Sequence, residues 1–111
     1  MSDEAKQILT FRIRAVAGQT ADDVRAILDE EVAAATREAS DVDRATADLP
    51  GAFGGVGETV VILVAILKAA GAAAGKGAMA AAGKYFFDTY VKPRLQKRNL
   101  QVSDATVKPA D

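Results

Sequence analysis

The sequence contains no cysteine, no histidine and no tryptophan. Without cysteine and histidine the chain lacks disulfides, thiolate nucleophiles, imidazole bases and the usual ligands of zinc. Carboxylates, lysines and hydroxyls remain as catalytic groups. Neighbouring acidic residues such as Asp22 and Asp23 point about 100° apart on a helix, which suits acid–base chemistry poorly. These absences predict that the chain is not an enzyme and that it holds neither a metal nor another cofactor.

Aromatic residues are scarce as well: they make up 5% of the 111 residues, whereas 50% of the residues are hydrophobic. A chain of this length has room for one small core. We therefore expect a single domain over residues 1–111, with a flexible N-terminus at residues 1–7. The polar, acidic start lacks the basic and apolar parts of a secretory signal, so we expect a cytoplasmic protein.

Charge is distributed unevenly along the chain, although the net charge is only −1. Residues 1–58 carry twelve acidic and six basic side chains, whereas residues 59–111 carry three acidic and eight basic ones. The two halves can attract each other, or the opposite half of a neighbouring molecule. The slightly negative net charge argues against a nucleic-acid partner.

The first half predicts a strand followed by a helix. Residues 8–16 alternate between apolar and polar side chains, which is typical of a half-buried strand. Thr20, followed three residues later by Asp23, resembles a capping box at a helix start. Apolar residues then recur at three- and four-residue spacing, which predicts a helix over residues 20–39.

Beyond residue 40 the sequence changes from polar to apolar. Residues 40–57 are rich in aspartate and glycine and predict a loop, within which alternating residues at 44–49 predict a short strand. Residues 58–92 form the most apolar part of the chain. We expect helical structure there, with a break near the glycines of 75–77, because glycine disfavours a helix interior.

The C-terminal part predicts one more strand. Pro93 is expected to end or kink any helix that reaches it, because proline has no amide hydrogen to donate. Alternating residues at 100–107 then predict a terminal strand. Together these elements predict an α+β fold, in which a small two- or three-stranded sheet packs against two or three helices.

Two segments are candidate interaction surfaces. In the predicted apolar helix, Gly71 and Gly75 lie four residues apart beside an aliphatic run, and such small residues allow another helix to approach closely. The basic segment before the terminal strand is the second candidate. The expected interface residues are Val60, Ile62, Leu63, Ile66, Leu67, Gly71, Gly75, Lys92, Arg94, Lys97 and Arg98.

The basic segment also carries aromatic residues, and three interpretations compete for it. The simplest is a solvated helix end whose cations complement the helix dipole and whose aromatics lie in the core. The second is a docking surface for an acidic protein, including the acidic helix of a neighbouring copy. The third is contact with anionic lipids.

The apolar region is long enough to span a bilayer, but Lys68 and Lys76 interrupt it. Each lysine would cost about 2.5–3.5 kcal/mol near the bilayer centre. A helix buried within a folded protein or an oligomer is therefore favoured over a membrane-spanning one, and membrane insertion after oligomerisation stays open as an alternative.

The order of these motifs resembles the effector-associated constant component family. The resemblance spans residues 9–107 and rests on Phe-Arg-Ile-Arg at 11–14, on the helix start at 23–28 and on the glycine-to-apolar segment at 57–67. The alanine-rich residues 69–83 and the longer acidic first helix depart from the family pattern. Membership would imply a small bacterial protein that accompanies variable effectors in conflict or antiphage systems as a non-enzymatic adaptor, with no catalytic residue.

We therefore expect an intracellular, non-enzymatic adaptor or assembly module of a bacterial conflict system that self-associates and docks a protein partner. The alternative is a membrane-active effector whose apolar helical region at 58–90 inserts after oligomerisation. The two hypotheses differ in what the basic segment contacts, which is an acidic protein in the first and anionic lipid in the second.

Overall fold

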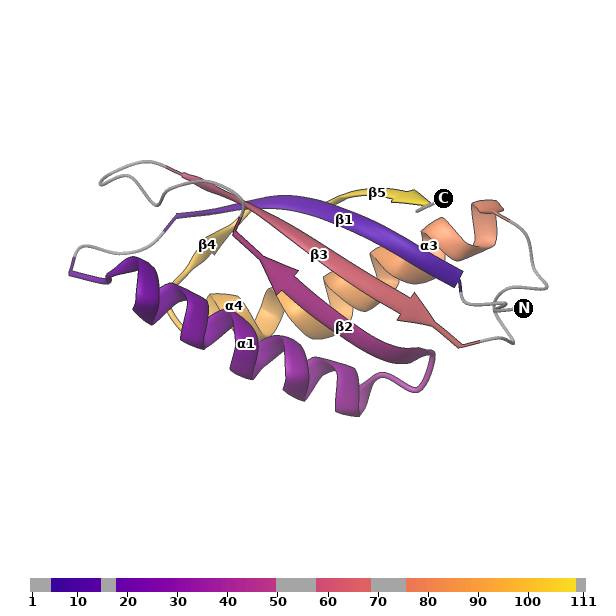
Figure 1. Ribbon diagram of the computed structural model, residues 1–111, viewed down its shortest axis with the longest axis horizontal. Helices are drawn as coiled ribbons and strands as arrows, with labels where there is room; N and C mark the ends of the chain where they lie inside the picture. The colour runs from indigo at the N-terminus through magenta and orange to yellow at the C-terminus, as the bar shows by residue number, and fades with distance from the viewer. Residues whose placement is uncertain (1–4, 15–17, 50–57, 69–75, 110–111) are drawn as a thin grey trace.

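The computed structural model of the chain describes residues 5–14, 18–49, 58–68 and 76–109. Their elements, in chain order, are β1 (Ala5–Arg14), α1 (Ala21–Glu38), β2 (Val42–Asp48), β3 (Thr59–Leu67), α3 (Lys76–Phe86), the π-helical turn η1 (Phe87–Val91), α4 (Lys92–Lys97), β4 (Gln101–Val102) and β5 (Thr106–Pro109) (Figure 1). The predicted α+β class is confirmed. Within these residues the sheet has five strands, more than the sequence predicts, because the predicted terminal strand is two short strands and the apolar run adds another.

Strand β1 has the alternation that the sequence predicts. Its core side carries the buried residues Leu9, Phe11 and Ile13. The strand begins at Ala5, which pairs with Leu67 of β3. The expectation of a flexible terminus is therefore wrong for residues 5–7, because strand pairing holds them, and residues 1–4 lie outside the described part of the chain.

Helix α1 begins at the predicted capping box. The Asp23 amide donates to the Thr20 hydroxyl (3.1 Å), and the Thr20 amide donates to the Asp23 carboxylate (3.0 Å). The two hydrogen bonds satisfy amides that the first helical turn leaves without an internal partner. The predicted range of 20–39 thus includes the whole of α1 and its two cap residues.

Strand β2 confirms the short strand expected at 44–49 and extends it at its start. It pairs antiparallel with β3. The predicted loop at 40–57 is therefore wrong for residues 42–48, which form this strand. Residues 50–57 lie outside the described part.

The largest correction concerns the predicted apolar helical region at 58–92. Residues 59–67 form strand β3, which lies in the middle of the sheet between β1 and β2. The run consists mainly of valine, isoleucine and leucine, and β-branched side chains favour strands over helices. Nine residues suit a strand better than a helix, and a central strand can be apolar on both faces. Residues 76–86 form helix α3, as the helical prediction expects for them, and residues 69–75 lie outside the described part of the chain.

Pro93 is expected to end or kink the helix, and the first of these alternatives is wrong, because the helical segment continues through this residue. Pro93 lies in the first turn of α4, where proline is tolerated. In the preceding turn η1 the Lys92 amide donates to the Phe87 carbonyl, five residues back. Such a π-helical turn shifts the hydrogen-bond pattern and so adjusts the helix ahead of the proline.

Helix α4 ends in a left-handed cap. Asn99 has a φ of 66°, and its amide donates to the Gln96 carbonyl (3.1 Å), while the Leu100 amide donates to the Leu95 carbonyl (3.2 Å). This pair of hydrogen bonds is the Schellman motif. It turns the chain so that buried Leu100 enters the core and the following residues reach β1.

The predicted terminal strand at 100–107 is present as two short strands, β4 and β5, on the same edge of β1. Between them Ser103 is fixed to Arg12 by two hydrogen bonds. The Ser103 amide donates to the Arg12 carbonyl, and the Arg12 amide donates to the Ser103 hydroxyl. The donor–acceptor distance is 2.9 Å in each hydrogen bond. The C-terminal residues therefore cover the edge of β1 that β3 does not occupy.

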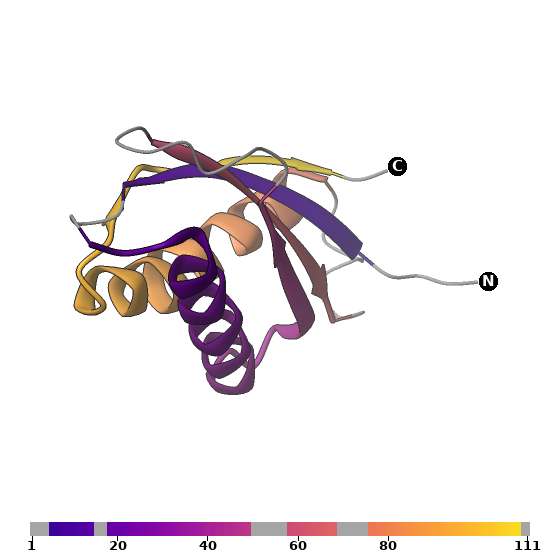
Figure 2. The ribbon, with the colours of Figure 1, turned by 60° about the vertical axis from the view of Figure 1, so that its left-hand side comes forward.

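The strand order is β2-β3-β1-β4, with every neighbouring pair antiparallel and β5 also on β1. Strand, helix, two strands, helix and strand in this order form the split βαβ, or ferredoxin-like, arrangement. Both helical segments lie against one face of the sheet, which we call the inner face (Figure 2). We call the opposite face the outer face, and no described helix covers it.

The core lies between the inner face and the helices. The rings of Phe11 on β1 and Phe87 on η1 pack with their centroids 4.7 Å apart. Gly83 lets α3 come close to the sheet, because a Cβ atom at this position would lie 3.2 Å from Cγ1 of Val107. The helical segment thus packs against β1 through the Phe87 ring and approaches β5 closely at Gly83.

Candidate functional site

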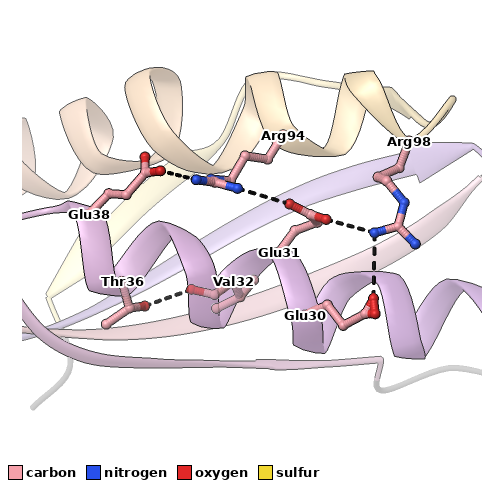
Figure 3. Close-up of polar contacts among 7 residues, drawn as sticks. All are labelled: Glu30, Glu31, Val32, Thr36, Glu38, Arg94 and Arg98. Atoms are coloured by element: carbon pink, nitrogen blue, oxygen red, sulfur yellow. Dashed lines mark hydrogen bonds and ion pairs between the residues drawn. The ribbon is translucent and has the colours of Figure 1, made fainter.

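The arginines of the predicted basic segment lie on α4 and point at α1 of the same chain (Figure 3). Arg94 contacts Glu31, with 3.3 Å between nitrogen and oxygen, and also contacts Glu38. Arg98 contacts Glu31 at 2.7 Å and Glu30 at 3.5 Å. Glu31 therefore lies between the two guanidinium groups. We call these five residues the interhelical cluster.

Glu31 is the most enclosed member of the interhelical cluster. Its side chain is 14% exposed, compared with 60% for Glu30 and 54% for Glu38. The hydrogen bond to Glu31 raises the pKa of Arg98, although partial burial acts in the opposite direction. Exposed ion pairs are worth at most about 1 kcal/mol each, so we expect Glu31 to carry most of the stabilisation.

A further ion pair connects α4 to the segment between the two terminal strands. The Lys92 ammonium group lies 2.9 Å from the Asp104 carboxylate, and this hydrogen bond lowers the pKa of Asp104. Lys97 is exposed and forms no ion pair with any described residue. Of the four predicted basic interface residues, three are therefore engaged within the chain and one is exposed.

A groove of about 430 Å³ lies between α1 and the η1–α4 segment. Its walls consist of Glu31, Glu38, Thr89, Tyr90, Pro93, Arg94, Lys97 and Arg98. The carboxylates in this wall neutralise the neighbouring guanidinium groups, so an anionic ligand would compete with them for the same hydrogen bonds. Within the described ranges no group of three or more acidic side chains could hold a metal ion.

The aromatic residues of the basic segment mostly belong to the core. Phe86 and Phe87 are buried, Tyr90 is partly buried, and Tyr85 is 58% exposed. The rings of Tyr85 and Tyr90 meet edge to face, with centroids 6.2 Å apart. The buried phenylalanines agree with the simplest interpretation of the segment. Lys92, Arg94 and Arg98 differ from it, because they contact carboxylates of their own chain.

The predicted apolar interface residues fall on opposite faces of the sheet, because residues 59–67 form a strand. Leu63 and Leu67 are buried in the core on the inner face and are not available to a partner. On the outer face lie Val60, which is 39% exposed, Ile62, which is partly buried, and Ile66, which is only 7% exposed. Gly71 and Gly75 lie outside the described residues.

The outer face carries a line of aliphatic side chains from β3, bordered by the outward side chains of β1 and β2. The strand register places Ile66 between Arg44 and Lys6, for example. Val60 lies opposite Arg12. We refer to the outward-pointing residues of β1, β2, β3 and β5 together as the outer-face surface. They are Lys6, Ile8, Thr10, Arg12, Arg14, Arg44, Thr46, Asp48, Val60, Ile62, Val64, Ile66, Thr106 and Lys108.

Cations predominate on the outer-face surface. It holds two lysines and three arginines but only one carboxylate, that of Asp48. None of its residues is aromatic, so the stacking that single-stranded nucleic acid requires is missing from it. An apolar line bordered by cations can instead contact aliphatic side chains and pair with carboxylates at the same time.

Most residues of this surface are not among those that the sequence predicts for an interface. Lys6, Arg12, Arg14, Arg44 and Lys108 are spread over three strands, and only the strand register brings them together. The signals that could have found them are the period-two alternation of β1 and the β-branched residues of the run at 59–67. The helical interpretation of that run concealed the second signal.

None of the helices in the ranges that the structure describes is long and apolar enough to cross a membrane. The alternative hypothesis of a membrane-active effector requires a helical region at 58–90. That premise is wrong for residues 59–67, which are hydrogen-bonded into the sheet on both sides.

Comparisons with family models, with curated proteins and with solved structures find no match for this chain. The outer-face surface and the interhelical cluster are therefore the features of the molecule from which we infer a function.

Proposed function

We propose that the chain is a non-enzymatic adaptor that binds an acidic protein partner on its outer-face surface. The observation that carries this proposal is the line of exposed and partly buried aliphatic residues on β3 with cations on both borders. The setting in a bacterial conflict system comes from the sequence resemblance alone. Self-association is the second part of the proposed function.

Charge explains why the partner is expected to be acidic. Cations that border an apolar surface attract a complementary partner over a distance and select its orientation, while apolar contacts supply much of the lasting affinity. Arg94 and Arg98 contribute little to this attraction, because the glutamates of α1 neutralise them. The outer-face surface thus supports docking better than the predicted basic segment does.

The test is site-specific photocrosslinking in cells that express the chain naturally. A photoreactive residue at Ile62, at the centre of the outer-face surface, should capture a partner that the same residue at exposed Arg37 on α1 does not capture. We expect the purified partner to bind with an affinity that falls as salt rises. Arg12→Glu combined with Lys108→Glu should weaken this binding at least about tenfold.

A matched control separates charge from fold stability. Arg37→Glu changes the same kind of charge on α1, at an exposed position away from the outer-face surface, and should leave the affinity within about twofold of the original. Equal capture at Ile62 and Arg37, or binding that the outer-face reversal does not change, would refute the proposal. Binding to anionic vesicles or to poly(U) in preference to the acidic protein would also refute it.

A further inference from the structure

Strand β2 has one edge that no described strand occupies. It lies at the end of the sheet and pairs only with β3 within the described residues. The pairing is irregular between Val42 and Arg44, and from Arg44 to Asp48 the register is regular. Backbone amide and carbonyl groups along such an edge form a template for another strand.

The sequence of this regular edge is complementary to itself. Residues 44–48 read Arg-Ala-Thr-Ala-Asp, which is symmetric about Thr46 except that the two ends have opposite charges. In an antiparallel pair of two copies centred on Thr46, Arg44 lies opposite Asp48 of the partner subunit, and Ala45 lies opposite the partner's Ala47. Opposite charges and paired threonines are both favourable cross-strand neighbours.

The same register satisfies the backbone. Along a strand, every second residue points its amide and carbonyl groups to the same edge. Pairing about Thr46 matches odd-numbered residues with odd-numbered ones and even with even. Outward-pointing backbone groups of one copy therefore meet outward-pointing groups of the other.

The side chains beside the edge leave room for a second strand. Arg44, Thr46 and Asp48 are exposed, and Asp48 approaches Arg25 only to 4.0 Å, with both side chains largely in solvent. On the inner side a groove of about 260 Å³ separates α1 from β2. The groove is lined by Asp29, Val32, Ala33, Ala45, Thr46 and Ala47, and its three alanines contribute only methyl groups to its walls.

We infer that two copies of the chain pair edge to edge through residues 44–48 of β2 and form one continuous antiparallel sheet. The twofold axis passes between the two Thr46 residues, so the assembly closes as a dimer. It places the outer-face surfaces of both copies on the same side, where one acidic partner can contact both. This inference rests on the self-association part of the proposed function.

The test is the molar mass of the purified chain, measured by light scattering over a range of concentrations up to several hundred micromolar. The wild type should be a dimer at the upper end. Arg44→Asp should weaken dimerisation at least about tenfold, because the new aspartate at position 44 of each copy then lies opposite Asp48 of the other copy. Asp48→Arg should do the same with two guanidinium groups.

The decisive variant combines both substitutions. Arg44→Asp with Asp48→Arg exchanges the charges and recreates both opposite-charge pairs, so dimerisation should return to within about threefold of the wild type. Thr46→Lys, which places like charges on the twofold axis, should also weaken the dimer. Arg12→Asp changes charge on the outer face away from β2 and serves as the control, and Arg25→Ala measures the loss of its contact with Asp48.

A wild type that stays monomeric at all concentrations would overturn the inference. So would a dimer that the single reversals leave intact, or one that the exchanged variant does not restore. Circular dichroism checks that each variant folds. Capture of an acidic partner at Ile62 by a monomeric chain would contradict this inference and the self-association part of the proposed function, but not its docking part. A β2 dimer without such a partner would contradict only the docking part.

Discussion

The two sides of this molecule use their cations differently. On the helical side, Arg94 and Arg98 are matched by the carboxylate of Glu31, which lies between them. On the outer face, Arg12 and Arg14 are exposed, and no described carboxylate lies within ion-pair distance of either. The first pair of arginines holds two helices together, and the second pair is available to a partner.

The contrast arises from the periodicity of helices and strands. Glu31 and Glu38 are seven residues apart on α1 and therefore share a face, as do Arg94 and Arg98, which are four apart on α4. Two such faces can neutralise each other when the helices pack. In β1 the period of two instead places Arg12 and Arg14 beside the aliphatic side chains of β3. A basic segment in a sequence is thus a weak guide to a basic surface.

The largest expected effect separates the two faces of β3. Leu63→Ala should lower the free energy of unfolding by about 2–5 kcal/mol, because it leaves a cavity among buried side chains. Ile62→Ala, at the neighbouring position on the outer face, should cost about 1 kcal/mol or less. Urea unfolding of both variants measures the difference. Equal costs would contradict the alternation that defines the outer face.

The second prediction concerns the interhelical cluster. Glu31→Gln removes the charge between Arg94 and Arg98 and should cost about 1–2 kcal/mol of unfolding free energy, because hydrogen bonds to charged groups are lost in a partly buried place. Glu30→Gln changes a largely exposed pair and should cost less than about 0.5 kcal/mol. If both substitutions had the same small effect, α4 would not depend on Glu31.

A third, smaller effect depends on pH. Lys92 lowers the folded-state pKa of Asp104 below its ordinary value of 3.8. The unfolded chain therefore binds the proton more readily, so the stabilisation is present above that value and is lost as pH falls through the folded pKa. An NMR titration should show the pKa of Asp104 rising in Lys92→Met. An unchanged pKa would mean that the ion pair is absent in solution.

The smallest expected effect is on the outer face. Arg12→Ala should change the free energy of unfolding by less than about 0.5 kcal/mol, because the side chain is exposed and has no described ion-pair partner. Thermal unfolding of Arg12→Ala and Arg94→Ala in parallel compares the two sides of the molecule, and Arg94→Ala should be the less stable variant. A large loss in Arg12→Ala would show that the outer-face cations serve stability.

The sequence predicted elements with strong local signals correctly. The capping box at Thr20, the alternation of residues 8–13 and the alternating C-terminal residues all depend on neighbours in the chain. Residues 59–67 carry no such signal, because a central strand and a buried helix are both apolar throughout. Only pairing with β1 and β2, which are distant in sequence, makes this run a strand.

The candidate sites were harder to predict for the same reason. The charge asymmetry between the two halves of the chain was recognised, but the sequence left open whether it acts within one molecule or between copies. The contacts of Arg94 and Arg98 with Glu31 show that, for these residues, it acts within one chain. The outer-face surface could be recognised only from the strand register. This register pairs residues up to about a hundred positions apart, and Gln7 with Pro109 is an example.

The most direct test of the account is an NMR titration of the arginine side chains with a soluble glutamate-rich peptide. Each guanidinium group reports through its own Nε–H signal, so both sides of the molecule are observed in one experiment. The account predicts that the signals of Arg12 and Arg14 shift as peptide is added, whereas those of Arg94 and Arg98 stay in place. Shifts at Arg94 and Arg98, without shifts at Arg12 and Arg14, would contradict it.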